Sequence, residues 1–244
     1  MVNTAQETED SATETEDLAD EIDGAAETAG APSGTDGSPV VSRIQAPFDS
    51  HPRLTLGNTF RHFRTITHHK WLVMRNCFKV GLYWQGLVHD LSKYSPTEFW
   101  VGARYYQGFR SPNAAERADK GYSAAWLHHK GRNRHHFEYW IDIRGNGDGT
   151  LEGKPMPVRY VVEMFCDRVA ASKVYEKSDY TDRSALEYYE LENSCGYALI
   201  HPDANALLRW MLELLAEKGE DEAFREVREK VVRPRLSVGE CRWS

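Results

Sequence analysis

The chain has 244 residues, enough for one domain with a good core but short for two independent domains. Its net charge of -7 is unevenly spread: residues 1–40 carry 11 Asp/Glu and no Lys/Arg, which leaves 26 of the 37 acids against all 30 bases in residues 41–244. This mildly basic balance of +4 suits a site for anionic substrates. It falls well short of the basic face of a dedicated nucleic-acid-binding protein.

The cysteines and the apolar segments narrow the class of protein further. The four cysteines are widely spaced and form no C-x-x-C pair, so the pattern predicts reduced thiols in place of a zinc ribbon or a disulfide framework. No run of about 18 apolar residues exists, and the first residues are acidic and polar. We therefore expect a cytoplasmic protein with no membrane partner.

The first segment differs in composition from the rest of the chain. Residues 1–45 are rich in Glu, Thr, Ala, Asp, Gly and Ser and contain no aromatic residue, so they predict a disordered acidic tail. An alternative is that this tail docks on a basic patch of its own domain. After the tail we expect a metal-binding helical domain over residues 46–180, with residues 181–244 as a helical extension packed on it.

From Asn58 onwards, large apolar residues recur at spacings of three and four, which predicts an all-α fold. The segment Ser95 to Glu98 has the residue types of a capping box, which favours Glu98 as a cap over Glu98 as a ligand. Residues 144–157 contain four glycines and two prolines and predict a loop that joins two helical halves. The expected helices span 58–80, 82–93, 96–107, 113–130, 135–142, 156–177, 183–193, 202–218 and 220–231.

The histidines cluster in one part of the chain, since eight of the ten fall between residues 62 and 136. Imidazole together with carboxylate suits iron, manganese or zinc, and the lack of paired cysteines argues against a thiolate site. The clustered histidines are His62, His68, His69, His89, His128, His129, His135 and His136.

The central motif is His89-Asp90, which follows an apolar stretch and precedes Lys93 by one turn. Neighbouring side chains at a helix end can reach one ion, and the carboxylate of Asp90 can bridge two ions. Lys93, near the same face, can hold a phosphate oxygen as a point charge. We therefore expect Asp90 and Lys93 to take part in catalysis.

The remaining expected ligands lie on other helices. His69 shares its helix face with Leu72, Val73 and Val80, so it is the preferred upstream ligand and His68 is the alternative. Two histidine pairs, His128-His129 and His135-His136, flank a short turn. Either member of each pair can be the one that binds metal. Asp167 lies in an apolar stretch, where a carboxylate needs a partner, and a pairing with Arg168 is the alternative. The full expected ligand set is His69, His89, Asp90, His128, His129, His136 and Asp167.

Other conspicuous residues have simpler interpretations. A single histidine on an apolar helix is usually a hydrogen-bonded core residue, so we assign His51, His62 and His201 to the surface or to packing. Five tryptophans on the predicted helices are expected in the core, not on a stacking platform. They are Trp71, Trp84, Trp100, Trp126 and Trp140.

This order of His, His-Asp, further histidines and Asp resembles the HD-domain superfamily of metal-dependent enzymes. The segments His-Asp-Leu-Ser-Lys-Tyr-Ser-Pro-Thr-Glu-Phe and His-His-Lys-Gly-Arg-Asn-Arg-His-His-Phe-Glu-Tyr-Trp also look like an uncharacterised bacterial family, a domain of unknown function, over about residues 55–180. The resemblance implies an HD-like helical bundle that holds one or two divalent ions, with His69, His89-Asp90, the histidines between 128 and 136, and Asp167 as ligands.

Three functions follow as hypotheses. The first is a phosphohydrolase in which a metal-bound hydroxide attacks a phosphate ester or nucleotide, with Lys93, Arg132 and Arg134 binding the phosphate. The second is an HD-type di-iron oxygenase. The third is a non-catalytic module that binds metal, a nucleotide or a partner. The helices between residues 183 and 231 carry no chemical signature and offer a possible homodimer face.

Overall fold

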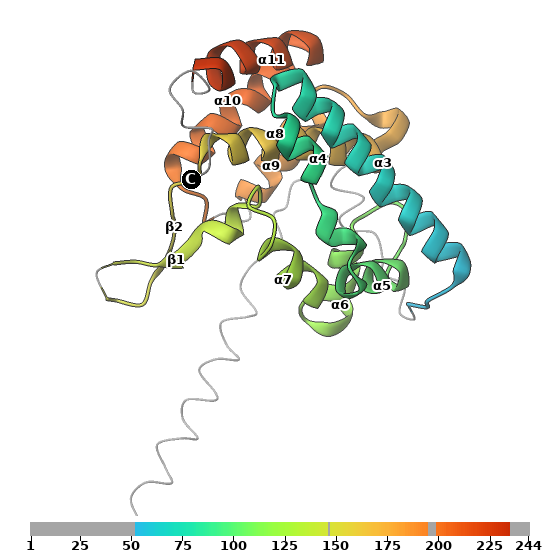
Figure 1. Ribbon diagram of the computed structural model, residues 1–244. Coiled ribbons are helices and arrows are strands. Elements are labelled where there is room, and N and C mark those ends of the chain that lie inside the picture. The colour runs from blue at the N-terminus through green and yellow to red at the C-terminus, as the bar shows by residue number, and fades with distance from the viewer. Residues whose placement is uncertain (1–51, 146, 195–198, 235–244) are drawn as a thin grey trace, which may run out of the picture. The chain divides into compact units, whose positions relative to one another are not determined.

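The computed structural model describes residues 52–145, 147–194 and 199–234 (Figure 1). These residues belong to one compact unit. Within them lie nine α-helices and a single small sheet, so the predicted all-α class is confirmed. The expected acidic tail and His51 fall outside the described residues, and the predicted boundary at residue 180 stays a prediction.

The helices are mostly short, and α3 and α8 are the longest. Two short strands pair antiparallel, with Ile141 opposite Gly153 and Ile143 opposite Leu151. None of the described helices is long and apolar enough to cross a membrane. The α-helices are α3 Leu56–Val80, α4 Tyr83–Val88, α5 Pro96–Arg104, α6 Pro112–Lys120, α7 Ala124–Lys130, α8 Val158–Glu176, α9 Ser184–Ser194, α10 Pro202–Lys218 and α11 Glu220–Glu226. Short helical turns cover Leu91–Tyr94, Phe137–Trp140 and Lys177–Asp179, a π-helix covers Val227–Val232, and the strands are β1 Ile141–Ile143 and β2 Leu151–Gly153.

Local signals set the ends of the helices. The hydroxyl of Thr55 accepts a hydrogen bond from the backbone N–H of Asn58 and so caps the start of α3. Gly81 ends the same helix with a φ of 89°, a left-handed conformation that glycine adopts without steric cost. The bounds of α10 coincide with the prediction of a helix over residues 202–218.

Three of the predicted helices are wrong in extent. The helix expected over 113–130 is broken because Gly121, at a φ of 79°, ends α6 and the Ser123 hydroxyl caps a new helix, α7. The helix expected over 82–93 ends at Val88, before the His-Asp pair. The segment 135–142 forms a single 3₁₀ turn and then β1, whose partner β2 lies in the predicted loop 144–157.

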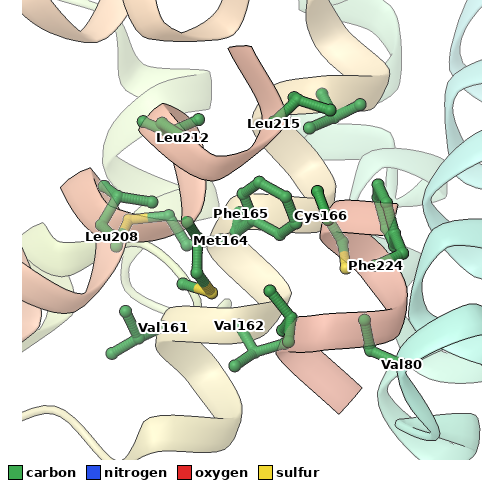
Figure 2. Close-up of a cluster of buried hydrophobic side chains, with 14 of the residues drawn as sticks. Val80, Val161, Val162, Met164, Phe165, Cys166, Leu208, Leu212, Leu215 and Phe224 are labelled. Atoms are coloured by element: carbon green, nitrogen blue, oxygen red, sulfur yellow. The ribbon is translucent and has the colours of Figure 1, made fainter. Parts of the chain in front are cut away.

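The core is centred on α8. Residues 161–166 of this helix are all buried, because α3 packs on one side of it and α9 and α10 pack on another (Figure 1). Figure 2 shows Phe165 of α8 among leucines of α10, close to Phe224 of α11. The two phenyl rings lie 5.2 Å apart between centroids. This packing holds α8 in place against α3. These two long helices both carry side chains of the candidate metal centre.

The prediction of tryptophans in the core is wrong for three of the five. Trp71, Trp84 and Trp100 are 45%, 62% and 50% exposed, whereas Trp126 and Trp140 are partly buried. The reason on α3 is that the helix carries two apolar stripes and only one of them faces α8. Periodicity alone does not distinguish the buried stripe from the exposed one.

Candidate metal centre

The His-Asp pair occupies a sharp change of direction in the backbone. α4 ends at Val88, and Asp90 then adopts φ 52° and ψ 27°, the left-handed region that aspartate tolerates better than most residues. A short 3₁₀ turn over Leu91–Tyr94 follows. His89 and Asp90 are both 1% exposed, so this turn places an imidazole and a carboxylate together in the interior.

A first group of possible ligands joins α3, the turn after α4, and α8. Its ligand atoms come from His69, His89, Asp90 and Asp167, and all lie within 4.8 Å of one another. Nε2 of His69 lies 2.9 Å from Asp167 Oδ1 and 3.7 Å from Asp90 Oδ2. Nε2 of His89 lies 3.2 Å from Asp90 Oδ2 and 3.5 Å from Asp167 Oδ1. Two imidazoles and two carboxylates thus face one point.

A second group lies on the other oxygen of the same aspartate. Asp90 Oδ1 is 3.3 Å from Nε2 of His129 and 3.4 Å from Nε2 of His135, while Nε2 of His136 lies 2.9 Å from Nε2 of His129. These four residues also have ligand atoms within 4.8 Å of one another. Each oxygen of Asp90 therefore faces a different group, as a carboxylate that bridges two ions would.

The distances within the groups fit the edges of a coordination shell. Two atoms bound ~2.1 Å from the same ion lie ~3.0 Å apart in octahedral geometry and ~3.4 Å apart in tetrahedral geometry. The separations above fall around these values. Nine buried side-chain atoms of the described residues make no hydrogen bond of acceptable geometry, and five of the nine are ligand atoms of these groups. These five are Nε2 of His69, His89 and His135 and both carboxylate oxygens of Asp90.

Two buried glutamates orient the histidines from behind. Glu163 Oε1 lies 2.9 Å from Nδ1 of His89 and 3.2 Å from Nδ1 of His135. Glu98 Oε2 lies 2.7 Å from Nδ1 of His129. Because an ionised carboxylate only accepts hydrogen bonds, each of these Nδ1 atoms carries a hydrogen, and each Nε2 offers a lone pair to a metal once it has given up its own proton.

Glu98 is therefore not the helix cap that the sequence suggested. Ser95 does precede the first residue of α5 and Pro96 is that residue, but the Ser95 hydroxyl makes no capping hydrogen bond. The carboxylate of Glu98 turns inward and accepts from His128 and His129, each at 2.7 Å. Long-range contacts with α7, which the local pattern does not contain, decide its role.

The electrostatics of the centre favour a bound cation. Burial disfavours a charged His89, but Asp90 and the other carboxylates outweigh it and raise the pKa of His89 well above its usual value. Burial likewise opposes the charge of Asp90, yet His89 and Lys93 hold the pKa of Asp90 well below its usual value. Burial and then the neighbouring His135 lower the pKa of His136, which favours the neutral form that binds metal.

The count of charges leads to the same conclusion. Four carboxylates, from Asp90, Glu98, Glu163 and Asp167, surround the two groups, and Lys93 forms an ion pair with one of them. Nζ of Lys93 lies 2.5 Å from Asp90 Oδ2. Protonated histidines can balance the excess of negative charge, and so can divalent ions.

The remaining predicted site residues lie in different positions. His128 is partly exposed and contacts Glu98, and it belongs to neither group of ligand atoms. Arg132 and Arg134 are exposed, and the guanidinium of Arg134 lies 5.6 Å from the ring centroid of Tyr139. The alternative ligand His68 is exposed and stacks near Trp71.

The two histidines assigned to the surface or to packing lie apart from both groups. His62 is buried against Phe99 and Gly102, and His201 caps the start of α10. Neither belongs to a group of possible metal ligands.

Sequence reasoning missed the role of Glu163 and left His135 out of the preferred set. The signal for Glu163 was present, since an acid between Val162 and Met164 in a fully buried stretch needs a partner. The two histidines 135 and 136 both lie at the centre, so the choice between them was unnecessary.

One comparison with known proteins gave a match. The model of a family described as a family of unknown function, DUF5662, matches residues 58–214. This range runs from α3 into α10 and includes every residue of both groups. No curated protein and no solved structure matches the chain.

Proposed function

The chain belongs to the DUF5662 family of unknown function, and from the geometry of its buried side chains we propose that it is a metal-dependent hydrolase of phosphate esters or nucleotides. The observation that carries this proposal is the position of Asp90, whose two oxygens face two adjacent groups of nitrogen and oxygen ligands. Such an arrangement suits two divalent ions that share one carboxylate. Imidazole and carboxylate ligands favour iron, manganese or zinc.

The order of the ligands supports the same class of enzyme. His69, His89-Asp90 and Asp167 form the first group, which is the order of ligands in the HD-domain superfamily that the sequence resembles. The second group adds three histidines on and after α7. We therefore assign the first group to the ligand pattern of that superfamily and the second group to an additional ion.

Divalent ions held by these residues would lower the pKa of a coordinated water and would neutralise the charge of the phosphate. The protein holds its imidazoles in place through Glu98 and Glu163, so the ligand atoms need little rearrangement. Lys93, whose side chain is 28% exposed beside Asp90, would contact a phosphate oxygen. Arg132 and Arg134 are exposed, and we give them at most a role in attracting an anionic substrate.

A panel of phosphate esters and nucleotides tests the proposal. Protein loaded with manganese, iron or zinc should release phosphate from at least one member, and Asp90→Ala should abolish the release. Arg228→Gln, which changes an exposed cation on the π-helix, serves as the matched control and should retain the activity. Equal rates for Asp90→Ala and the wild type would show that the assignment is wrong.

A di-iron oxygenase is the second candidate, and the number of imidazoles favours it. Five histidines against two direct carboxylates make a nitrogen-rich pair of sites, which suits iron as well as zinc. Protein loaded with iron should then give a mixed-valence signal by electron paramagnetic resonance that disappears in Asp90→Ala. A colourless protein that is active with manganese would exclude this candidate.

A further inference from the structure

A row of large apolar side chains is exposed along α3 and continues onto α4. Phe60 and Phe63 lie in the first half of α3, Trp71 and Phe78 lie in the second half, and Trp84 and Leu87 belong to α4. Phe60 and Trp84 are 62% exposed and Leu87 is 50% exposed. We call these six residues the aromatic face.

The spacing of these residues makes the face continuous. Positions 60, 63, 71 and 78 of α3 are three, eight and seven residues apart, which are steps of three and four or their sums, so they follow one side of a helix that is 25 residues long. The ring of Phe78 lies 5.2 Å from that of Tyr83, where α4 begins. Lys70 joins the two helices by donating to the backbone oxygen of Leu87 at 2.8 Å. In Figure 1, α3 is the right-hand edge of the coloured helices, with α4 beside it.

Cations border the aromatic face, and the segment that forms it carries no exposed carboxylate. α3 contains five Lys/Arg and no Asp/Glu. Arg64 and Arg75 are exposed, make no ion pair within the described ranges, and lie on the helix side next to the aromatic residues. The guanidinium of Arg75 lies 4.6 Å from the ring centroid of Trp71. Between Arg53 and Thr97 the sole acid is Asp90, which is buried.

We propose that the aromatic face docks on an anionic membrane surface. A face of Phe, Trp and Leu with Arg along its edge is the composition of helices that lie in the plane of the lipid headgroups. The rings would enter the headgroup region, and Arg64 and Arg75 would contact lipid phosphates. Such docking needs no spanning segment, so it agrees with the absence of a membrane-crossing helix among the described residues.

Charge argues against two other occupants. A second copy of this chain, related by a twofold axis, would bring the cations of one α3 near those of the other. A nucleic acid would leave most of the apolar side chains without a matching surface, because it would contact mainly the arginines. An anionic lipid surface matches both the apolar side chains and the arginines of this face. The expectation of no membrane partner rested on the lack of a long apolar segment, which a lateral face does not require.

The test is co-sedimentation of the full chain with vesicles of phosphatidylcholine alone or mixed with phosphatidylglycerol. We expect binding to the mixed vesicles, weakening as salt is added, and a blue shift of tryptophan fluorescence on binding. The double variant Phe60→Ser, Leu87→Ser should lower the partition coefficient at least about tenfold, because two exposed side chains leave the lipid. Arg64→Gln and Arg75→Gln should each lower it about fivefold.

Matched controls separate the face from general surface effects. Leu151→Ser removes a side chain that is 52% exposed on β2, and Arg228→Gln removes an exposed cation on the π-helix. Both should bind vesicles like the wild type, and all variants should keep the wild-type metal content and melting temperature. Because metal content should stay unchanged in the variants that lose vesicle binding, this measurement separates the docking proposal from the proposed hydrolase.

Three results would overturn the proposal. The first is no sedimentation with anionic vesicles. The second is an equal loss of binding in the control variants. The third is that the wild type does not bind vesicles but forms a dimer in light scattering, or a complex with DNA in a gel shift, and that the double variant Phe60→Ser, Leu87→Ser abolishes this association.

Discussion

Glu163 Oε1 lies 2.9 Å from Nδ1 of His89, and the opposite ring nitrogen of that histidine lies 3.2 Å from Asp90. A carboxylate behind the ring fixes the tautomer and makes Nε2 a better metal ligand. Glu163 is itself 4% exposed and contacts a second histidine, His135, so one buried glutamate positions a ligand of each group.

Glu163→Gln should weaken metal binding without unfolding the protein. The amide keeps the size of the side chain but removes the negative charge, so we expect a rise in the metal Kd of about 10- to 100-fold, measured by competition with a chelating dye. Glu226→Gln is a matched control, because Glu226 is 7% exposed and pairs with Lys218 and Lys230 away from the centre. An unchanged Kd in Glu163→Gln would show that Glu163 does not position the histidines for metal binding.

His136→Ala and His69→Ala should each lose one ion and keep the other. His136 belongs only to the second group and His69 only to the first, whereas Asp90 belongs to both. Metal content measured by mass spectrometry should therefore fall from about two ions per chain to about one in either single variant, and to about zero in Asp90→Ala. Loss of all metal in His136→Ala with its fold intact would contradict two separable sites.

Lys93→Met should affect the reaction more than the metal. Burial opposes the charge of this lysine, but Asp90 and Asp167 outweigh it and raise its pKa, so the side chain stays cationic at neutral pH. We expect unchanged metal content and a fall in kcat/KM for the best phosphate ester of about 100-fold, measured by phosphate release. Arg228→Gln is again the control. A loss of metal in Lys93→Met would instead mean that the lysine holds the site together.

His62 should make stability depend on pH in acid. Burial, and to a smaller degree Lys93, lower the pKa of His62 to about 4. The unfolded chain, with a histidine pKa of about 6.5, binds the proton more readily, so stability falls as the pH drops from about 6.5 to about 4. The full loss is about 3 kcal/mol. His62→Gln should flatten this part of the curve of unfolding free energy against pH, measured with urea. Parallel curves for the two proteins would contradict the assignment.

Much of the centre could be predicted from the sequence, because polar residues in apolar helices stand out. His69 recurs with Val73 and Val80 on one face, and the structure buries all three. Asp167 follows a buried apolar run and lies 2.9 Å from His69. In both cases the residue type and its apolar neighbours were sufficient to place the side chain inside.

The rest depended on contacts between distant segments. The residue types from Ser95 to Glu98 fit a capping box. In the fold, however, α7 supplies His128 and His129 as stronger partners for Glu98. The apolar stripe of α3 that carries Trp71 looked like core because the sequence does not say which stripe faces α8. Likewise, the prediction of one helix over residues 113–130 did not take account of Gly121, which ends α6.

The most direct test is the metal content of the full chain, purified without a tag and without a chelator, beside Asp90→Ala. We expect about two ions of iron, manganese or zinc per chain in the wild type, because the two groups of ligand atoms share Asp90, and their loss in the variant. No metal in the wild type, even after reconstitution with each of the three ions, would contradict the central claim.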